Sequence, residues 1–350
     1  MESSQSTVRD NVKEGRIERL LPLLRAHGRC PTSFLCLNPD LTIYQAGGTE
    51  GFLAYGSTSQ SNAILGEPVC PPSETSDLLR SFVGFSADEG SDVVSMPVTQ
   101  EARPHYEESG FESLWVGSEA VVDLSSLSLE GPRYRNLRHG VGHAKRAGVT
   151  VDLLAGESLD RRTLAKEFQR ISRDWLKSRK TGSLSFIVGK PFMPGYEACR
   201  HFVAKTERGL ETFAVFYPIF PSHGAYLDLT RRRLDSPRGA MDLLLWKAFR
   251  RLSEEGFRRV YMGMVPRAPS EHSFDQRDKA MKAALRYLDA IYPMTTERFF
   301  KSKFGPTWEP RFILFHPKVN LRGILALFRL IWPGGVPSIV RHKLARLGAS

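Results

Sequence analysis

Ser236-Pro-Arg-Gly-Ala-Met-Asp242 decides the fold of the second half of the chain, because a strand gives way to a helix at this stretch. The preceding segment, Tyr226–Thr230, is short and apolar, as a buried strand would be. After it, Ala240–Glu255 has apolar residues at helical spacing and is followed by Gly256. Arg259–Met262 is again apolar and short. This order predicts a strand, a glycine-containing turn, a helix and a second strand.

Backbone N–H groups at the start of such a helix can hold a phosphate or another oxyanion. Arg238 and Gly239 lie at this point in the sequence and are candidate binding residues. Acetyltransferases of the GNAT class bind a pyrophosphate here through a glycine-rich signature. The present stretch carries only part of that signature, which counts against ordinary acetyl-CoA binding.

The remaining segments predict a mixture of short strands and helices. In the first half, Ser33–Leu37 is expected to be a strand, and Phe111–Val116 and Ala120–Leu124 are expected to form a hairpin across Gly117 and Ser118. In the second half, the pattern predicts helices over residues 159–180 and 194–207 and a long strand over residues 211–220.

The chain has 350 residues, more than a single hydrophobic core usually serves. We therefore expect an α/β (α+β) protein with two domains, each a mixed central sheet flanked by helices. Residues 1–148 are expected to form the first domain and residues 149–316 the second. Residues 317–350 are expected to form a basic, apolar tail.

The composition favours a cytosolic protein with polyanionic partners. Forty-nine Lys and Arg against 38 Asp and Glu give a net charge of +11, which favours nucleic acid or an anionic lipid surface. The four cysteines form no CxxC pair, which argues against a disulfide framework or a zinc site. No signal sequence is evident in residues 1–18, and no apolar run is long enough to span a bilayer.

Two segments concentrate the positive charge. Residues 132–147 predict a strongly basic helix, whose face is expected to contact RNA or lipid. His139 and His143 lie four residues apart on it, but no third ligand is evident, so no metal site is expected. Residues 321–347 mix aliphatic and aromatic residues with Arg and Lys. This pattern is typical of an element at an anionic membrane surface, or alternatively of a terminal helix packed on the protein body.

Motifs across residues 18–316 resemble the catalytic domain of the phosphatidylglycerol lysyltransferase and alanyltransferase family, which is also called multiple peptide resistance factor or DUF2156. The motifs fall in the family's order. They are Gly51-Phe-Leu-Ala-Tyr55, Leu65-Gly-Glu-Pro68, Tyr106-Glu-Glu-Ser-Gly-Phe111, Gly117-Ser-Glu-Ala-Val-Val-Asp-Leu124, Ile171-Ser-Arg-Asp-Trp-Leu176, Asp228-Leu-Thr-Arg231, Gly239-Ala-Met-Asp242, Met262-Gly-Met-Val-Pro266 and Phe300-Lys-Ser-Lys-Phe-Gly-Pro-Thr-Trp-Glu-Pro-Arg-Phe312.

The resemblance implies two tandem GNAT-like domains that meet at a channel, with an aminoacylated tRNA entering from one side and a lipid from the other. It implies catalytic roles for Asp228 and Arg231, within a motif where Thr230 replaces the usual Met, and for Lys301. In an ideal strand Asp228 and Arg231 point to opposite faces, so they can share a site only if the strand ends or bulges between them.

The resemblance and the charge pattern also name substrate-binding candidates. Lys303 and Arg311 are expected to hold phosphates of the tRNA end or of the lipid head group. Trp308, beside them, is a candidate for stacking on an unpaired base, although core packing is the alternative. Arg238 and Gly239 complete the set. No cofactor is implied beyond aminoacyl-tRNA as co-substrate.

Three functions from different classes remain open at this point. The first is transfer of an aminoacyl group from charged tRNA to a lipid hydroxyl, such as that of phosphatidylglycerol. The second is a GNAT-like acyltransferase that uses acyl-CoA or aminoacyl-tRNA on a soluble acceptor. The third is a catalytically silent protein that binds RNA or membranes. Bacterial family members carry a multi-helix membrane region that this chain lacks, so we expect a cytoplasmic protein on the inner face of the membrane.

Overall fold

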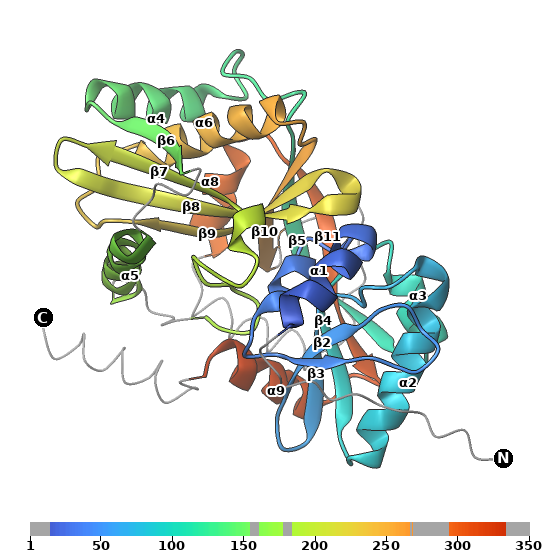
Figure 1. The fold of residues 1–350 in the computed structure, drawn as a ribbon. Helices are drawn as coiled ribbons and strands as arrows, with labels where there is room; N and C mark the ends of the chain where they lie inside the picture. The colour runs from blue at the N-terminus through green and yellow to red at the C-terminus, as the bar shows by residue number, and fades with distance from the viewer. Residues whose placement is uncertain (1–14, 155–160, 178–183, 267, 269–293, 334–350) are drawn as a thin grey trace, which may run out of the picture.

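The computed structural model describes residues 15–154, 161–177, 184–266, 268 and 294–333. Within these ranges the backbone forms one mixed 11-stranded sheet with helices on both faces (Figure 1). The expected α/β class, with a mixed sheet flanked by helices, is therefore confirmed.

The strands follow one another along the chain as β1 (Thr42–Tyr44), β2 (Leu53–Ser57), β3 (Ser61–Leu65), β4 (Asp92–Thr99), β5 (Glu112–Asp123), β6 (Thr150–Leu154), β7 (Arg200–Thr206), β8 (Gly209–Ile219), β9 (Gly224–Arg232), β10 (Arg259–Pro266) and β11 (Thr307–His316). The α-helices are α1 (Arg16–His27), α2 (Thr75–Asp88), α3 (Arg103–Glu108), α4 (Arg135–Arg146), α5 (Arg161–Lys177), α6 (Ala240–Glu254), α8 (Met294–Ser302) and α9 (Leu321–Ile331). Short 3-10 helices are η1 (Ser33–Leu37), η2 (Pro72–Glu74), η3 (Tyr196–Ala198) and η4 (Phe220–Ser222).

The two halves of the chain repeat one arrangement and exchange their last strands. In the first half, β1, β2 and β3 are antiparallel, and α2 leads to β4, which lies parallel to β3. In the second half, β7, β8 and β9 are antiparallel, and α6 leads to β10, which lies parallel to β9. The strand that ends the first half, β5, pairs with β10, whereas β11 from the second half pairs with β4. The halves therefore share one continuous sheet, in which β5 and β11 lie side by side.

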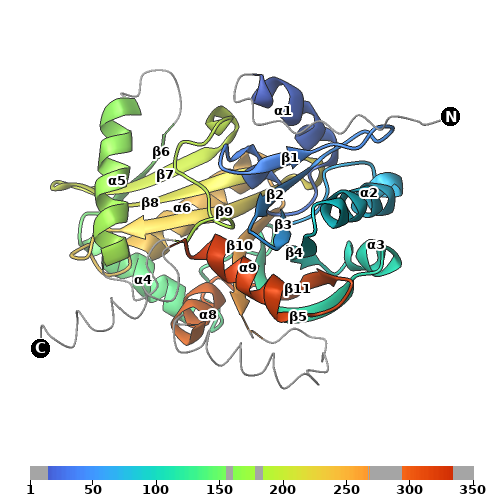
Figure 2. The same ribbon diagram turned by 90° about the horizontal axis from the view of Figure 1, so that it is seen from below.

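The helices divide the apolar core between the two faces of the sheet. One core combines α1, η1, α5 and α9 with side chains from both halves, among them Leu35, Phe168, Tyr217 and Leu327. On the opposite face, α4 and α6 cover the second half and α2 and α3 cover the first. Figure 2 shows α5 and α9 on one side of the sheet. The face that carries α5 is thus the one on which the two halves share a core.

The predicted β-turn-α-β unit is confirmed as β9, α6 and β10. The predicted hairpin at Gly117 is wrong, because residues 112–123 form the single strand β5 between β11 and β10, and Gly117 lies at a register shift. The helix predicted over residues 194–207 is also wrong. Half of it is β7, in which Phe202 and Val203 enter opposite cores. Such a short apolar run does not distinguish a strand from a helix. Ser33–Leu37, predicted as a strand, is the 3-10 helix η1.

Part of the predicted tail packs on the protein body. Asn320 caps α9, with its side-chain oxygen 2.8 Å from the backbone nitrogen of Gly323. The side chains of Leu327 and Ile331 are buried in the core shared by both halves, whereas Leu321 is 68% exposed and Leu325 is 45% exposed. Residues 334–350 lie outside the described part of the chain, so a membrane role for the tail stays a prediction, as does the boundary between residues 148 and 149.

Candidate active site at the fork between β9 and β10

The parallel strands β9 and β10 form a fork. They are paired only from Gly224 to Tyr226 on β9 and from Arg259 to Tyr261 on β10. Beyond these residues β9 continues along β8, and β10 continues along β5. Asp228 is the second residue past the pairing on β9, and Gly263 is the second on β10. Backbone groups past this divergence have no partner in the other strand of the fork.

Both strands of the fork bulge where these residues lie. On β8, the neighbours Val215 and Phe216 pair with Leu229 and Leu227, so Asp228 has no residue opposite it. A second register shift lies between Tyr261 and Met264 of β10, where Gly263 has a φ of 82°. Bulges re-aim side chains and are frequent beside active sites.

The bulge at Asp228 resolves the difficulty raised by the spacing of Asp228 and Arg231. One extra residue in the strand places both side chains on the face that carries α5. The guanidinium carbon of Arg231 lies 4.2 Å from the ring centre of Trp175 on α5, and its charge acts on Asp228. The structure thus brings these two predicted catalytic residues together.

Asp228 is held in an environment that opposes its ionisation. Burial raises the pKa of its carboxyl group to about 7, although the Gly189 N–H, the charge of Arg231 and the Tyr217 hydroxyl each lower it. The Gly189 nitrogen donates to Asp228 Oδ2 at 2.9 Å. A carboxyl group with a pKa near 7 can gain or lose a proton at neutral pH.

Gly189 and Tyr217 form the immediate surroundings of Asp228, and neither was predicted from the sequence. The Tyr217 hydroxyl interacts with Asp228 and also donates to the backbone oxygen of Lys190 at 3.0 Å. A Cβ on Gly189 would lie 2.3 Å from the Tyr217 oxygen and 3.0 Å from Asp228 Oδ2. Only glycine fits this close approach. An isolated glycine 39 residues before Asp228 gives no sequence signal for such a contact.

Lys301 reaches the β10 side of the fork from α8. Its Nζ donates to the Gly263 oxygen at 2.8 Å and pairs with Glu297 at 2.7 Å. Lys301 Nζ and the Tyr226 hydroxyl both lie within 4 Å of the position that a Cβ on Gly263 would take. Tyr226 also acts electrostatically on Tyr217, the partner of Asp228. Asp228, Tyr226 and Lys301 therefore line adjacent parts of one fork.

Arg311 belongs to a buried network of ion pairs that contacts β10 at the fork. Its guanidinium is 2% exposed and lies 2.6 Å from Glu119 and 3.2 Å from Glu309. Burial opposes the charge of Arg311, but the two carboxylates outweigh it and raise its pKa. Glu119 also accepts the Gly263 N–H at 3.1 Å. Arg311 thus supports the bulged strand, and its guanidinium is already engaged by carboxylates, in contrast to the phosphate contact predicted for it.

Lys303 lies on the other face of the sheet, away from Asp228. Its Nζ is 3.0 Å from both carboxylate oxygens of Asp242, which is buried at the start of α6. A Cβ on Gly239 would lie 2.0 Å from the backbone oxygen of Gly140 on α4. The predicted oxyanion site at the start of α6 is therefore covered closely by α4. Arg238 lies beside it and acts on Asp242.

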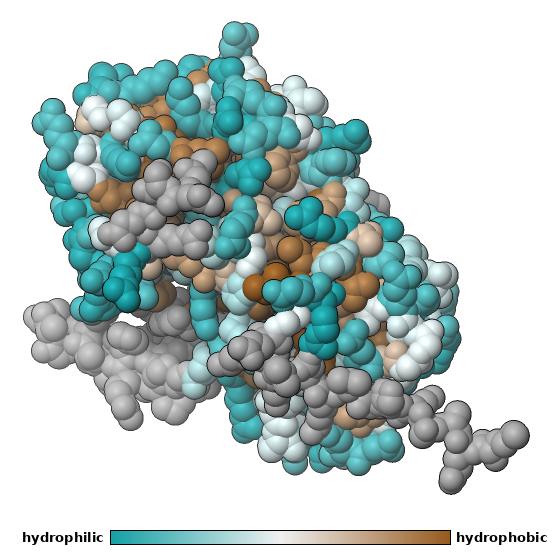
Figure 3. All heavy atoms as spheres, in the orientation of Figure 1, coloured by the Kyte–Doolittle hydropathy of each residue, from teal (hydrophilic) through white to brown (hydrophobic). Residues whose placement is uncertain are grey.

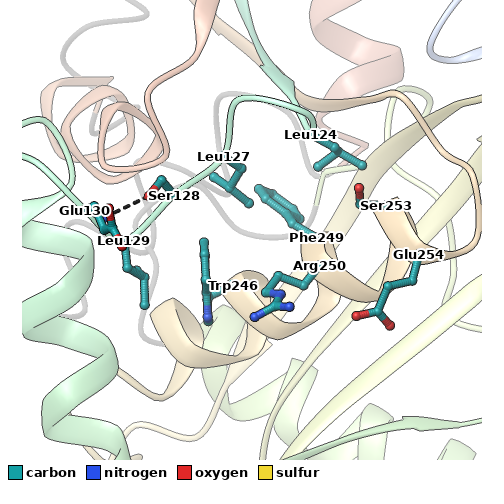
Figure 4. Close-up of a pocket in the computed structure, with 10 residues that line it drawn as sticks. All are labelled: Leu124, Leu127, Ser128, Leu129, Glu130, Trp246, Phe249, Arg250, Ser253 and Glu254. Atoms are coloured by element: carbon teal, nitrogen blue, oxygen red, sulfur yellow. Dashed lines mark hydrogen bonds between the residues drawn. The ribbon is translucent and has the colours of Figure 1, made fainter.

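Trp308 is partly buried and packs against two apolar clusters, one of them formed by Val265 and Ala268. This is the core-packing alternative considered for it. A hollow of about 430 Å³ lies elsewhere, between α6 and residues 124–130. Figure 4 shows Trp246 and Phe249 of α6 facing Leu127 across this hollow. It contains none of the fork residues.

Within the described residues, no group of three or more His, Cys, Asp and Glu side chains could hold a metal ion. None of the helices in the described part of the chain is long and apolar enough to cross a bilayer.

Comparison with known proteins gave consistent matches. The family model described as "Phosphatidylglycerol lysyltransferase, C-terminal" matches residues 22–315. Phosphatidylglycerol lysyltransferase of Staphylococcus aureus strain COL is 25% identical over 339 residues, which is 94% of this chain and 38% of that protein. The Bacillus subtilis strain 168 protein of the same name is 26% identical over 308 residues, 87% of this chain and 35% of that protein. The chain thus spans less than two fifths of the length of these relatives.

Two solved structures share the fold. One is the C-terminal domain (DUF2156) of an Agrobacterium fabrum protein described as a lysylphosphatidylglycerol synthetase. It has a TM-score of 0.77 and 23% identity, and the match covers 93% of this chain and 99% of that one. The other is L-PGS from Bacillus licheniformis, with a TM-score of 0.76 and 22% identity over 95% of this chain and 97% of that one. At these identities the likeness concerns the fold.

Proposed function

The chain belongs to the phosphatidylglycerol lysyltransferase C-terminal family, and on that premise we propose that it transfers an aminoacyl group from charged tRNA to a lipid hydroxyl, such as that of phosphatidylglycerol. The observation that carries the proposal is Asp228, a carboxyl group with a pKa of about 7, placed in a bulge where β9 has separated from β10. Such a group suits proton transfer at neutral pH.

The reaction needs little more than positioning and charge stabilisation, because an aminoacyl ester is already activated. Ionised Asp228 accepts the proton of the lipid hydroxyl while the hydroxyl oxygen forms a bond to the carbonyl carbon of the aminoacyl ester. The bond from that carbon to the tRNA ribose oxygen then breaks, and the proton passes to the leaving oxygen. This transfer of the aminoacyl group and the proton needs no oxidant and no metal ion.

The neighbours of Asp228 support the same role. The Gly189 N–H donates to the carboxylate, the Tyr217 hydroxyl interacts with it, and Trp175 positions Arg231 beside it. Lys301 of α8, which donates to Gly263 on the opposite strand of the fork, supplies positive charge near the developing oxyanion. In an alternative role, Asp228 binds the α-ammonium group of the amino acid, and the proton then leaves by another path.

We place the protein on the inner face of the cytoplasmic membrane, with aminoacyl-tRNA as co-substrate and an anionic lipid as acceptor. The net charge of +11 favours both partners. On α9, Leu321 and Leu325 are exposed beside Arg322, as in an element that touches a lipid surface. The close packing of Gly140 on Gly239 gives no support to acyl-CoA as the donor.

The test is a lipid extract from cells that express the wild type or Asp228→Ala, analysed by mass spectrometry for amino-acid adducts. We expect an aminoacylated lipid with the wild type alone, and its mass identifies both the amino acid and the acceptor. Equal adduct levels with Asp228→Ala would remove Asp228 from the mechanism. A wild type that gives no adduct would contradict the proposal of a lipid acceptor.

A further inference from the structure

The α6 side of the hollow between α6 and residues 124–130 is apolar and held in place from behind. Phe249 is completely buried, and its ring centre lies 5.2 Å from that of Phe304 and 6.1 Å from that of Phe216. Trp246, three residues earlier on α6, is 9% exposed. The hollow has a volume of about 430 Å³, within the range of about 300–1,000 Å³ that is usual for preformed small-molecule sites.

Residues 124–130 form the opposite wall, and their backbone is anchored to the rest of the protein. The Leu124 nitrogen donates to the Arg258 oxygen at 3.0 Å, at the end of β5. Further along, the guanidinium of Arg138 on α4 donates to the Leu129 oxygen. This wall lines the hollow with three leucines, Leu124, Leu127 and Leu129.

Two hydrogen-bond donors lie on the α6 side of this hollow. Trp246 and Arg250 are four residues apart, so they are neighbours on the helix surface. Figure 4 shows the indole nitrogen of Trp246 and the guanidinium of Arg250 at the same edge of the hollow. Among the residues that the structure describes, neither group has a hydrogen-bond or ion-pair partner. Both are therefore available to a ligand.

An exposed arginine alone would not indicate a site, because hydrophilic residues predominate on the face of the molecule seen in Figure 3. Arg250 differs from such residues by its position at the edge of an apolar hollow. The next residue, Arg251, does not line the hollow and pairs with Glu254 at 3.8 Å and with Glu255 at 2.9 Å. The two adjacent arginines thus differ in position and in partners.

Two carboxylates at the rim limit the charge of a ligand. Figure 4 shows the carboxylate of Glu254 directed away from the guanidinium of Arg250, and Glu130 belongs to the opposite wall. A phosphate monoester carries a charge of about −1.5 to −2 at neutral pH, whereas a carboxylate carries only one negative charge. The rim therefore favours a carboxylate over a phosphate monoester.

We infer that this hollow is a binding site for a monocarboxylate with an apolar chain, such as a fatty acid. The planar carboxylate fits the guanidinium of Arg250, which offers two parallel hydrogen bonds, and the Trp246 N–H supplies a third. The apolar chain lies between Phe249 and the three leucines, where its removal from water is favourable. The site is separate from the fork and does not depend on the proposed function.

The test compares Arg250→Gln with Arg251→Gln, which removes an equal charge from the same helix outside the hollow. Binding of decanoate to the full chain is measured by isothermal titration calorimetry. We expect saturable binding to the wild type and about tenfold weaker binding to Arg250→Gln, because hydrogen bonds between charged groups are strong. Arg251→Gln is expected to change the affinity by less than about twofold. Trp246→Phe keeps an aromatic ring without the N–H and is expected to bind about threefold more weakly.

Two further probes with the same chain, 1-decanol and the decyltrimethylammonium cation, separate the carboxylate from the apolar contribution. Weaker binding of both than of decanoate supports the inference. It is overturned if the wild type shows no saturable decanoate binding, if Arg250→Gln and Arg251→Gln have equal effects, or if either probe binds as tightly as decanoate. Circular dichroism and thermal unfolding check that the variants are folded.

Discussion

The two halves of the molecule contain the same strand-helix-strand unit, but only the second one opens into a fork. In the first half, β3 pairs with β4 from Ser61 to Leu65, over the whole length of β3. The contact then continues, because the Gly66 nitrogen donates to the Met96 oxygen at 2.7 Å. In the second half, pairing of β9 with β10 ends at Tyr226, and Asp228 follows in a bulge.

Each unit also places a partly buried carboxyl group just beyond its parallel pairing. Burial raises the pKa of Glu67, as it does for Asp228. Glu67, however, accepts the backbone N–H of Thr99 at 2.7 Å, within the continuing sheet. The Asp228 carboxylate faces a loop glycine and a hydroxyl, beyond the point where β9 and β10 separate. A titratable carboxyl group therefore becomes a candidate catalyst only where the strands beside it separate.

The difference between the two units is tested most strongly by neutralising the Asp228 and Glu67 carboxyl groups one at a time. Asp228→Asn is expected to lower kcat/KM for lipid aminoacylation by about 10²–10⁴, the usual contribution of a general base. The matched variant Glu67→Gln is expected to stay within about threefold of the wild type, because Glu67 acts in the sheet alone. Both are measured with charged tRNA and vesicles. A comparable loss in Glu67→Gln would show that the first unit also takes part in the reaction.

The ion network under the fork provides the next test. Arg311→Met leaves Glu119 buried without its guanidinium partner, and we expect a loss of about 3–5 kcal/mol in the free energy of unfolding. The control is Arg80→Ala in the first half, whose pair with Asp77 is more than half exposed and is worth about 0–1 kcal/mol. Denaturant unfolding measures both. Equal effects would mean that Arg311 contributes no more than a surface charge.

The smallest expected effect is a shift in the pH profile. Because the pKa of Asp228 is about 7, base catalysis is expected to be present above pH 7 and to be lost as the pH falls through that value. Tyr217→Phe removes a hydroxyl that lowers this pKa, so the midpoint is expected to rise by roughly 0.5–1 unit. The midpoint is measured from the profile of kcat/KM against pH. A downward shift would contradict the interaction of the Tyr217 hydroxyl with Asp228.

The same group links stability to pH. Asp228 has a pKa of about 7 in the folded protein, above its ordinary value, so the folded state holds this proton more tightly. The contribution to stability is present below the ordinary pKa and is lost as the pH rises towards 7. Asp228→Asn should therefore show a smaller fall in stability between pH 4 and pH 7 than the wild type does.

The local signals in the sequence were sufficient for the unit β9, α6 and β10, because apolar periodicity and Gly239 determine it within 43 residues. They were misleading at Gly117, which suggested a turn but lies inside β5. The reason is that β5 is paired on both sides with strands that come much later in the chain. Sequence alone does not reveal such partners.

The same limit applied to the candidate site. Asp228, Arg231 and Lys301 were predicted to share one site only through a family resemblance, since the bulge that aligns Asp228 with Arg231 leaves no local pattern. Lys303 and Arg311 were assigned to phosphates because a basic segment suggests an anionic ligand. Their carboxylate partners lie 61 and 192 residues away in the chain.

The exchange of β5 and β11 has a consequence for how the protein is made. During synthesis, β4 leaves the ribosome long before β11, the strand that pairs with it. Until residue 316 is available, one edge of β4 remains without its native partner, and apolar strand edges of this kind promote association between chains. A nascent chain is therefore expected to be most dependent on chaperones between the release of β4 and the release of β11, and to fold cooperatively once β11 completes the sheet.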